Sequence, residues 1–199
     1  MTTEGVPENL IKMIGQPYFE EVQNNIVERG DKLLLTSQPL KKYNDNKLGY
    51  DESDFWDICF QAIHKTNVKK VLCTHHPEEL YRDFKKDKNI VIYKGRGIQD
   101  IVDSHTVIGI SSTQMILGYL WGRKVASIQP KILKKDLFPL SRWGLVPRLE
   151  TVSEVIEFLK KDDLFESIKS SKKFNEETDE FRLNGSIDRL ELFCLKYRN

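Results

Sequence analysis

The sequence predicts an α/β fold in which a doubly wound parallel sheet carries helices on both faces and a helical extension follows it. Two observations indicate this class: short aliphatic runs of strand length recur, and longer stretches with helical periodicity separate them. Strands that alternate with helices in this way run parallel, with helices packed on both faces. We expect a single domain over 1–199, with a lead-in over 1–30, the sheet core over 31–130 and a mainly helical extension over 131–199.

Five apolar runs have the length and residue types of buried parallel strands. They cover residues 32–36, 70–74, 90–93, 106–110 and 124–128. Each run is followed by polar residues, glycine or proline, which are typical of chain turns. The loop after the first strand is expected to be polar around 44–46 and to end at Gly49.

The stretches between these strands have helical signals. Residues 52–65 place apolar side chains at the spacing of one buried helical stripe. These side chains are Phe55, Ile58, Cys59, Ala62 and Ile63. A second helix is predicted to begin at Pro77, because proline is favoured at the first helical position and two glutamates follow it near the positive helix end. Two more helices are predicted, over 98–104 and over 111–121.

The extension beyond the sheet is predicted to be mainly helical. Thr151 and Glu154 have the spacing of a capping box, which indicates a helix that starts there. A short helix is expected over 164–171, a polar surface loop over 172–179, and a last helix from Gly185 onward.

Composition excludes several classes of protein. The chain of 199 residues has 31 Lys and Arg against 30 Asp and Glu, a net charge of +1, which disfavours a dedicated duplex-binding protein. Its three cysteines are scattered and odd in number, as expected for reduced thiols rather than a disulfide framework. The apolar runs are too short for a transmembrane segment, and the N-terminus lacks the pattern of a secretory signal. We therefore expect a cytoplasmic protein.

Ligands of open parallel sheets bind beyond the carboxyl ends of the strands, so four loops are candidate sites. The most informative loop holds Ser111, Ser112 and Thr113 at a strand-to-helix junction. Backbone N–H groups and hydroxyls at a helix N-terminus suit a phosphate or diphosphate. The alternative is that these residues only cap the helix, since Ser and Thr are preferred N-caps. A serine-hydrolase elbow is disfavoured because Thr113 stands where that motif has glycine.

The loop after the second strand contains His75, His76 and Pro77. A histidine there could donate a hydrogen bond to a phosphate or a sugar hydroxyl, or it could simply anchor the loop. Cys73 and His75 share one side of the strand, but no further Cys or His pair stands at metal-ligand spacing. We therefore expect no metal and no cofactor.

The remaining two candidate loops follow the third and first strands. Gly95 and Gly97 permit close backbone approach, and Arg96 between them could pair with phosphate, although a plain turn is the simpler interpretation. Thr36 and Ser37 offer hydroxyl groups after the first strand. Neither a GxGxxG motif nor a P-loop is present, so the dinucleotide and ATP fingerprints are absent.

The order of these pieces is more specific than any one of them. It resembles the C-terminal, donor-binding half of GT-B glycosyltransferases and of the similar UDP-N-acetylglucosamine 2-epimerases. The segments that carry the resemblance are 5–11, 14–19, 35–39, 76–79, 108–113, 122–130 and 185–190. The resemblance implies a Rossmann-like domain whose cleft binds the nucleotide diphosphate of an activated sugar.

The resemblance also implies roles for the candidate residues. Ser111, Ser112 and Thr113 would face the diphosphate, and His76 would occupy a phosphate-binding position. The other implied positions are Thr36 and Ser37 in the first loop, with Gly95, Arg96 and Gly97 near the base.

Two departures from the families bear on function. Leu117 stands where they usually carry a glutamate that binds ribose or sugar hydroxyls, so donor discrimination is weakened. The chain also begins where the families have their hinge, which indicates that an acceptor-binding half must come from a partner protein or a second copy. We expect the nucleotide-sugar-binding half of a split glycosyltransferase in polysaccharide or glycan biosynthesis, with UDP as the nucleotide. The alternative is a non-catalytic interaction or regulatory domain with a degenerate GT-B-like fold.

Overall fold

A computed structural model gives the fold of most of the chain. The structure describes residues 30–44, 47–79, 91–95, 97–131, 136–161 and 185–196. Two compact units are distinguished, Val27–Ser170 and a second that combines 1–26 with 171–199. The first unit contains the sheet, and the described element of the second is helix α10 (Ser186–Lys196).

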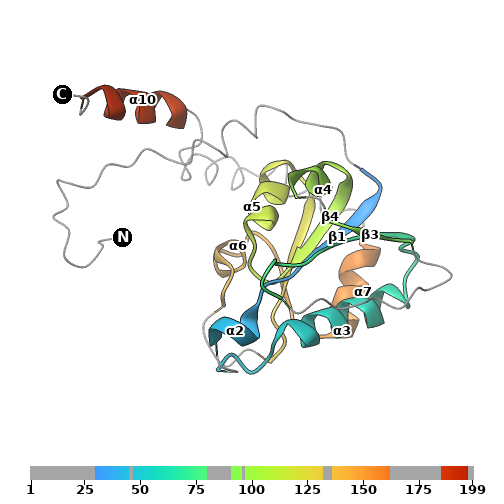
Figure 1. The fold of residues 1–199 in the computed structure, drawn as a ribbon. Helices are drawn as coiled ribbons and strands as arrows, with labels where there is room; N and C mark the ends of the chain where they lie inside the picture. The colour runs from blue at the N-terminus through green and yellow to red at the C-terminus, as the bar shows by residue number, and fades with distance from the viewer. Residues whose placement is uncertain are drawn as a thin grey trace. The chain divides into compact units, whose positions relative to one another are not determined.

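The sheet has six strands in the described part of the chain, all paired in parallel, in the order β3-β2-β1-β4-β5-β6 (Figure 1). The strands are β1 (Lys32–Thr36), β2 (Lys70–Thr74), β3 (Val91–Lys94), β4 (Ser104–Gly109), β5 (Lys124–Ile128) and β6 (Arg148–Leu149). This is the Rossmann order, and the predicted fold class is confirmed. The direction of winding reverses between β1 and β4, which leaves a crevice at their carboxyl ends.

Helices cover both faces of this sheet, with α4 and α5 on one side and α3 and α7 on the other (Figure 1). The helices of the sheet unit are α2 (Leu40–Asn44), α3 (Glu52–Ile63), α4 (Ile98–Val102), α5 (Thr113–Leu120), α6 (Pro139–Arg142) and α7 (Val152–Lys160). Among the helices that the structure describes, none is long and apolar enough to cross a membrane.

The core explains why the central strands and α3 form where they do. Leu33, Leu34 and Leu35 of β1 are all fully buried, as expected for a strand covered on both faces. The predicted stripe of α3 faces the core through Phe55 and Cys59 among others, and Asp51 caps the helix by accepting hydrogen bonds from two backbone N–H groups of its first turn.

Several predicted elements differ from the structure or lie outside it. Residues 77–79 form a turn, in which the Glu79 N–H donates to the His76 carbonyl at 3.0 Å, instead of the first helical turn predicted at Pro77. Residues 80–90, where that helix would continue, lie outside the described residues, as do 164–171 and 172–179.

Three short elements were not predicted. Helix α2 lies in the segment expected to be a polar loop, where Leu40 is buried against the core. Helix α6 begins with Pro139, and strand β6 is only two residues long. Elements of this length show too little periodicity to be recognised from sequence, and their tertiary contacts decide them.

Candidate functional site

A pocket of about 310 Å³ lies at the carboxyl ends of β1 and β2 and at the start of α5. It is lined by Thr36, Ser37, Gln38, Thr74, His75, His76, Pro77, Ser112, Thr113 and Gln114. Five of the predicted site residues, contributed by three loops, therefore meet in one cavity, beside the point where the strand order reverses. This is where open α/β sheets bind their ligands.

The N-terminus of α5 supplies a backbone hydrogen-bond donor to this pocket. Ser112 is the N-cap, and its hydroxyl accepts a hydrogen bond from the Gln114 N–H at 3.3 Å. Within the described residues the Thr113 N–H has no hydrogen-bond partner, and the Thr113 side chain is exposed. The positive end of the helix dipole adds to this N–H, so an anion is favoured here.

Ser111 lies on the other side of this loop. Its hydroxyl donates to the Leu137 carbonyl at 3.2 Å, and its own carbonyl accepts a hydrogen bond from the Gln38 side-chain amide. Ser111 lines an adjoining pocket of about 330 Å³ together with Tyr43, and both pockets share Gln38 and His76. The three predicted residues Ser111, Ser112 and Thr113 therefore do not all face one cavity.

The two histidines after β2 have different environments. The ring of His75 packs on Trp56, with centroids 4.8 Å apart, and its Nδ1 lies 3.2 Å from a carboxylate oxygen of Glu79. His76 is 43% exposed, and its Nδ1 accepts a hydrogen bond from the Glu78 N–H at 3.3 Å. A neutral His76 therefore carries its proton on Nε2, where it can donate to a ligand.

Glu79 organises the loops on this side of the pocket. Its side chain is 1% exposed, and Oε2 accepts from the Ser37 hydroxyl at 2.5 Å. In the part of the chain that the structure describes, Oε1 of Glu79 is buried without a hydrogen-bond partner. The Ser37 hydroxyl proton is therefore committed to Glu79, and Ser37 can offer a ligand only its oxygen lone pairs.

The loop after β3 is held by a second buried carboxylate. Asp100 accepts hydrogen bonds from the Thr74 hydroxyl at 3.1 Å and from the Gly97 N–H at 2.9 Å. A Cβ atom at Gly95 would lie 2.0 Å from the Thr74 hydroxyl oxygen, and Gly97 has φ +97°. The close approach at Gly95 and the positive φ of Gly97 thus explain why glycine stands at both positions. Arg96 lies outside the described residues.

Gln114 connects this loop to the helix that follows β4. Its side-chain amide donates to the Gly97 carbonyl at 3.2 Å, and the residue also lines the 310 Å³ pocket. Of the described residues, neither Gly95 nor Gly97 contributes to the lining of that pocket. The β3 loop is therefore positioned beside the pocket by Asp100 and Gln114.

Three further features limit the chemistry of the site. Leu117 is 3% exposed on α5, so no carboxylate stands at that position of the helix. Burial raises the pKa of the Cys73 thiol to about 12, so this group stays neutral at physiological pH and is a poor nucleophile. Among the residues that the structure describes, no group of three His, Cys, Asp or Glu could hold a metal ion.

Sequence reasoning assigned no contact within the site to Gln38, Glu79, Asp100 or Gln114. Each lies after a strand end or in the first turn of a helix, which is a usable signal. Their long-range partners lie 17 to 73 residues away, however, and no periodicity reports such contacts.

Comparison with known proteins supports the fold. No protein-family model and no curated protein sequence matches the chain. The structure of Methanocaldococcus jannaschii UDP-GlcNAc 2-epimerase in complex with UDP-GlcNAc and UDP superimposes with a TM-score of 0.54 at 13% identity, over 85% of this chain and 51% of that one. The glycosyltransferase SnogD from Streptomyces nogalater gives a TM-score of 0.54 at 13% identity, over 83% of this chain and 44% of SnogD.

The class that emerges is a Rossmann-like α/β domain with the fold of one half of a GT-B glycosyltransferase, which the epimerase shares. The resemblance inferred from the order of sequence motifs is confirmed at the level of the fold. The chain spans about half the length of these two proteins.

Proposed function

We propose that the chain binds the nucleoside diphosphate part of a nucleotide sugar in the 310 Å³ pocket, as the donor-binding half of a glycosyltransferase. The single observation that carries the proposal is that Thr36, Ser37, His76, Ser112 and Thr113, from three separate loops, line one cavity at the N-terminus of α5. The GT-B fold and the crevice between β1 and β4 support the same assignment.

The chemistry of the lining suits a diphosphate. The Thr113 N–H and the α5 helix end supply positive potential, and His76 Nε2 can donate a hydrogen bond. In glycosyl transfer an acceptor oxygen bonds to the anomeric carbon while the bond from that carbon to the diphosphate breaks. The departing diphosphate gains negative charge, which these fixed donors would stabilise.

The acceptor site is proposed to come from elsewhere. A GT-B enzyme reacts between two halves, so we infer that a partner protein or a second copy supplies the acceptor and the base that takes its proton. The three free cysteines support a cytoplasmic location, and the proposed pathway is polysaccharide or glycan synthesis with UDP as the first nucleotide to test. In this proposal Gly95, Arg96 and Gly97 lie toward the base.

A second candidate function is a non-catalytic interaction or regulatory domain. The observation that favours it is the buried Leu117, which cannot accept a hydrogen bond from ribose or sugar hydroxyls. Only the first function requires nucleotide binding, so a binding measurement distinguishes the two.

Calorimetric titration of the full chain with UDP, GDP, CDP and CMP tests the proposal. We expect saturable binding of at least one diphosphate, tighter than CMP. Replacing Ser112 with Asp keeps a good N-cap but places a negative charge at the anion site, so binding is expected to be lost while thermal stability is retained. Ser153→Ala, an exposed change on α7, is a control for handling and folding of a variant and should bind normally.

The outcomes separate the two functions. Binding to the parent chain and the Ser153→Ala control, with loss in Ser112→Asp, supports the donor site. A well-folded parent chain that binds none of the four nucleotides overturns it and favours the non-catalytic domain.

A further inference from the structure

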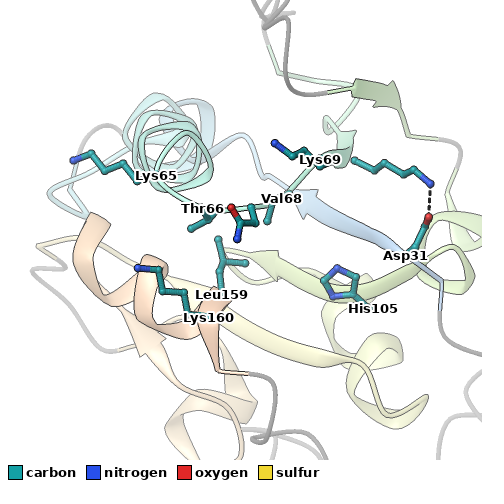
Figure 2. A pocket seen from close by; sticks show the side chains of 10 residues that line it. Asp31, Lys65, Thr66, Val68, Lys69, His105, Leu159 and Lys160 are labelled. Atoms are coloured by element: carbon teal, nitrogen blue, oxygen red, sulfur yellow. Dashed lines mark hydrogen bonds and ion pairs between the residues drawn. The ribbon is translucent and has the colours of Figure 1, made fainter.

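A third and larger pocket lies at the opposite edge of the sheet, at the amino ends of β1, β2 and β4 (Figure 2). Its volume is about 730 Å³, within the range of small-molecule sites. The pocket is lined by Asp31, Lys65, Thr66, Asn67, Val68, Lys69, Lys70, His105, Leu159 and Lys160. Because the amino ends of the strands lie away from the carboxyl-end crevice, this pocket is separate from the proposed donor site.

The lining is strongly basic. It contains four lysines against one acidic residue, and that residue, Asp31, forms an ion pair with Lys70. Within the described residues, Lys65, Lys69 and Lys160 have no carboxylate partner. Three lysines around one hollow therefore have no neutralising carboxylate among the described residues, although the whole chain has a net charge of only +1.

Helix capping explains part of this pattern. Lys65 follows the end of α3 and Lys160 lies in the last turn of α7, where cations offset the negative end of a helix dipole. Lys69 stands in the loop just before β2 and caps no helix. Lys65 and Lys69 lie in the connection between α3 and β2, and Lys160 comes from α7. Figure 2 shows Lys65 and Lys160 extending to the same side of the hollow, with Lys69 on another side of it.

The rest of the lining suits a compact polar ligand. Val68 and Leu159 are half-buried in the lining, and His105 is half-buried at the start of β4 with its Nδ1 2.6 Å from the Thr106 hydroxyl. A lysine ammonium group is a compact point charge, so it can bind a phosphate oxygen from many directions.

We propose that this hollow is a binding site for an anion carrying two or more phosphate groups, either free in solution or as a lipid headgroup. Lysines gathered around one hollow fit clustered phosphates better than an extended nucleic acid, which requires a basic stripe along the surface. The site is independent of the proposed donor pocket.

Titration of the full chain with inorganic pyrophosphate, followed by amide chemical shifts, tests this site directly. Saturable shifts are expected at Thr66 and Asn67, weakening as salt is added. Shifts at Thr113 and Gln114 report the donor pocket separately, so failure at one site is distinguishable from failure at the other. The proposal is overturned if Thr66 and Asn67 show no saturable change up to about 10 mM pyrophosphate. Such a result would mean that binding contributes less than about 3 kcal/mol.

A charge-matched pair of variants tests the assignment to the lysines. Lys69→Gln/Lys160→Gln is expected to raise the dissociation constant for pyrophosphate at Thr66 and Asn67 at least about fivefold, because two nearby charges are removed. Lys41→Gln/Lys131→Gln removes the same charge from exposed positions outside the hollow and should leave that constant unchanged. Equal effects of the two double variants would show that only net charge matters, and would overturn the site.

Vesicle sedimentation distinguishes the two sources of phosphate. The probes are vesicles of phosphatidylcholine alone and of phosphatidylcholine with a bisphosphorylated inositol lipid. Lipid-dependent sedimentation that Lys69→Gln/Lys160→Gln abolishes identifies a headgroup as the ligand. Pyrophosphate binding without sedimentation identifies a free anion as the ligand.

Discussion

The Ser37 hydroxyl donates a hydrogen bond to the buried carboxylate of Glu79 across 2.5 Å, which ties the loop after β1 to the turn after β2. The same carboxylate oxygen lies 3.2 Å from Nδ1 of His75. The Glu79 side chain thus fixes two loops of the candidate donor pocket. His76, which follows His75 in the chain, is exposed and lines this pocket. Glu79 is therefore a positioning residue for this edge of the sheet.

Removing the Glu79 carboxylate is expected to destabilise the fold. Glu79→Ala leaves the Ser37 hydroxyl and His75 without their acceptor, and an unsatisfied buried group costs about 1–3 kcal/mol. Glu79→Gln keeps one acceptor oxygen and should cost less. The free energy of unfolding in urea measures both, with Glu157→Ala, an exposed change on α7, as the control. A cost for Glu79→Ala no larger than for the control would contradict the positioning role.

Gly95 is expected to be required for packing against the neighbouring strand end. A Cβ atom there would lie 2.0 Å from the Thr74 hydroxyl oxygen and 2.9 Å from a carboxylate oxygen of Asp100. Gly95→Ala should therefore cost about 1–3 kcal/mol in unfolding free energy, as overpacked sites do.

A double-mutant cycle identifies the cause. Gly95→Ala/Thr74→Ala removes the hydroxyl that the new methyl group meets, so the two changes should cost less together than separately. Additive costs in urea unfolding would show that the Thr74 hydroxyl is not the obstacle.

How much of this molecule could be predicted from its sequence depends on the range of the contacts involved. The strands β1 to β5 and the helices α3, α5 and α7 follow from local periodicity and caps, such as Thr151 with Glu154, and the structure has them within a few residues. The GT-B fold followed from the order of motifs.

The interior of the site could not be predicted to the same extent. Glu79 and Ser37 are 42 residues apart, and Gln38 and Ser111 are 73 apart, so neither contact leaves a periodic trace in the sequence. Ser37 was expected to bind a ligand through its hydroxyl group, yet that hydroxyl donates its hydrogen bond to Glu79. Gly95 was expected near a base, yet its lack of a side chain is already explained by Thr74.

The capping box of α7 predicts a pH dependence of stability. Hydrogen bonds from the backbone N–H groups of Glu150 and Thr151 hold the pKa of Glu154 below its usual value of 4.5. Because the folded-state pKa is the lower one, this contribution is present above pH 4.5 and is lost as pH falls through the folded-state pKa.

Comparison of the parent chain with Glu154→Gln measures this contribution. We expect the parent to be more stable at pH 7, with a difference that shrinks below about pH 4.5 as the carboxyl group is protonated. Urea unfolding across this range is the measurement. A difference that stays constant down to acid pH would show that the charge of Glu154 is not involved.

His76 offers the sharpest test of how the candidate pocket holds a ligand, because its two nitrogens have separate roles. Nδ1 accepts from the Glu78 N–H at 3.3 Å, which leaves the proton on Nε2. His76→Asn keeps an acceptor near Nδ1 but withdraws the distal donor, whereas His76→Gln places an amide near Nε2. We expect His76→Gln to retain more affinity for UDP than His76→Asn, by about tenfold or 1.4 kcal/mol, the worth of one hydrogen bond. Calorimetry measures both constants, and equal affinities in the two variants would show that the Nε2 proton does not contact the ligand.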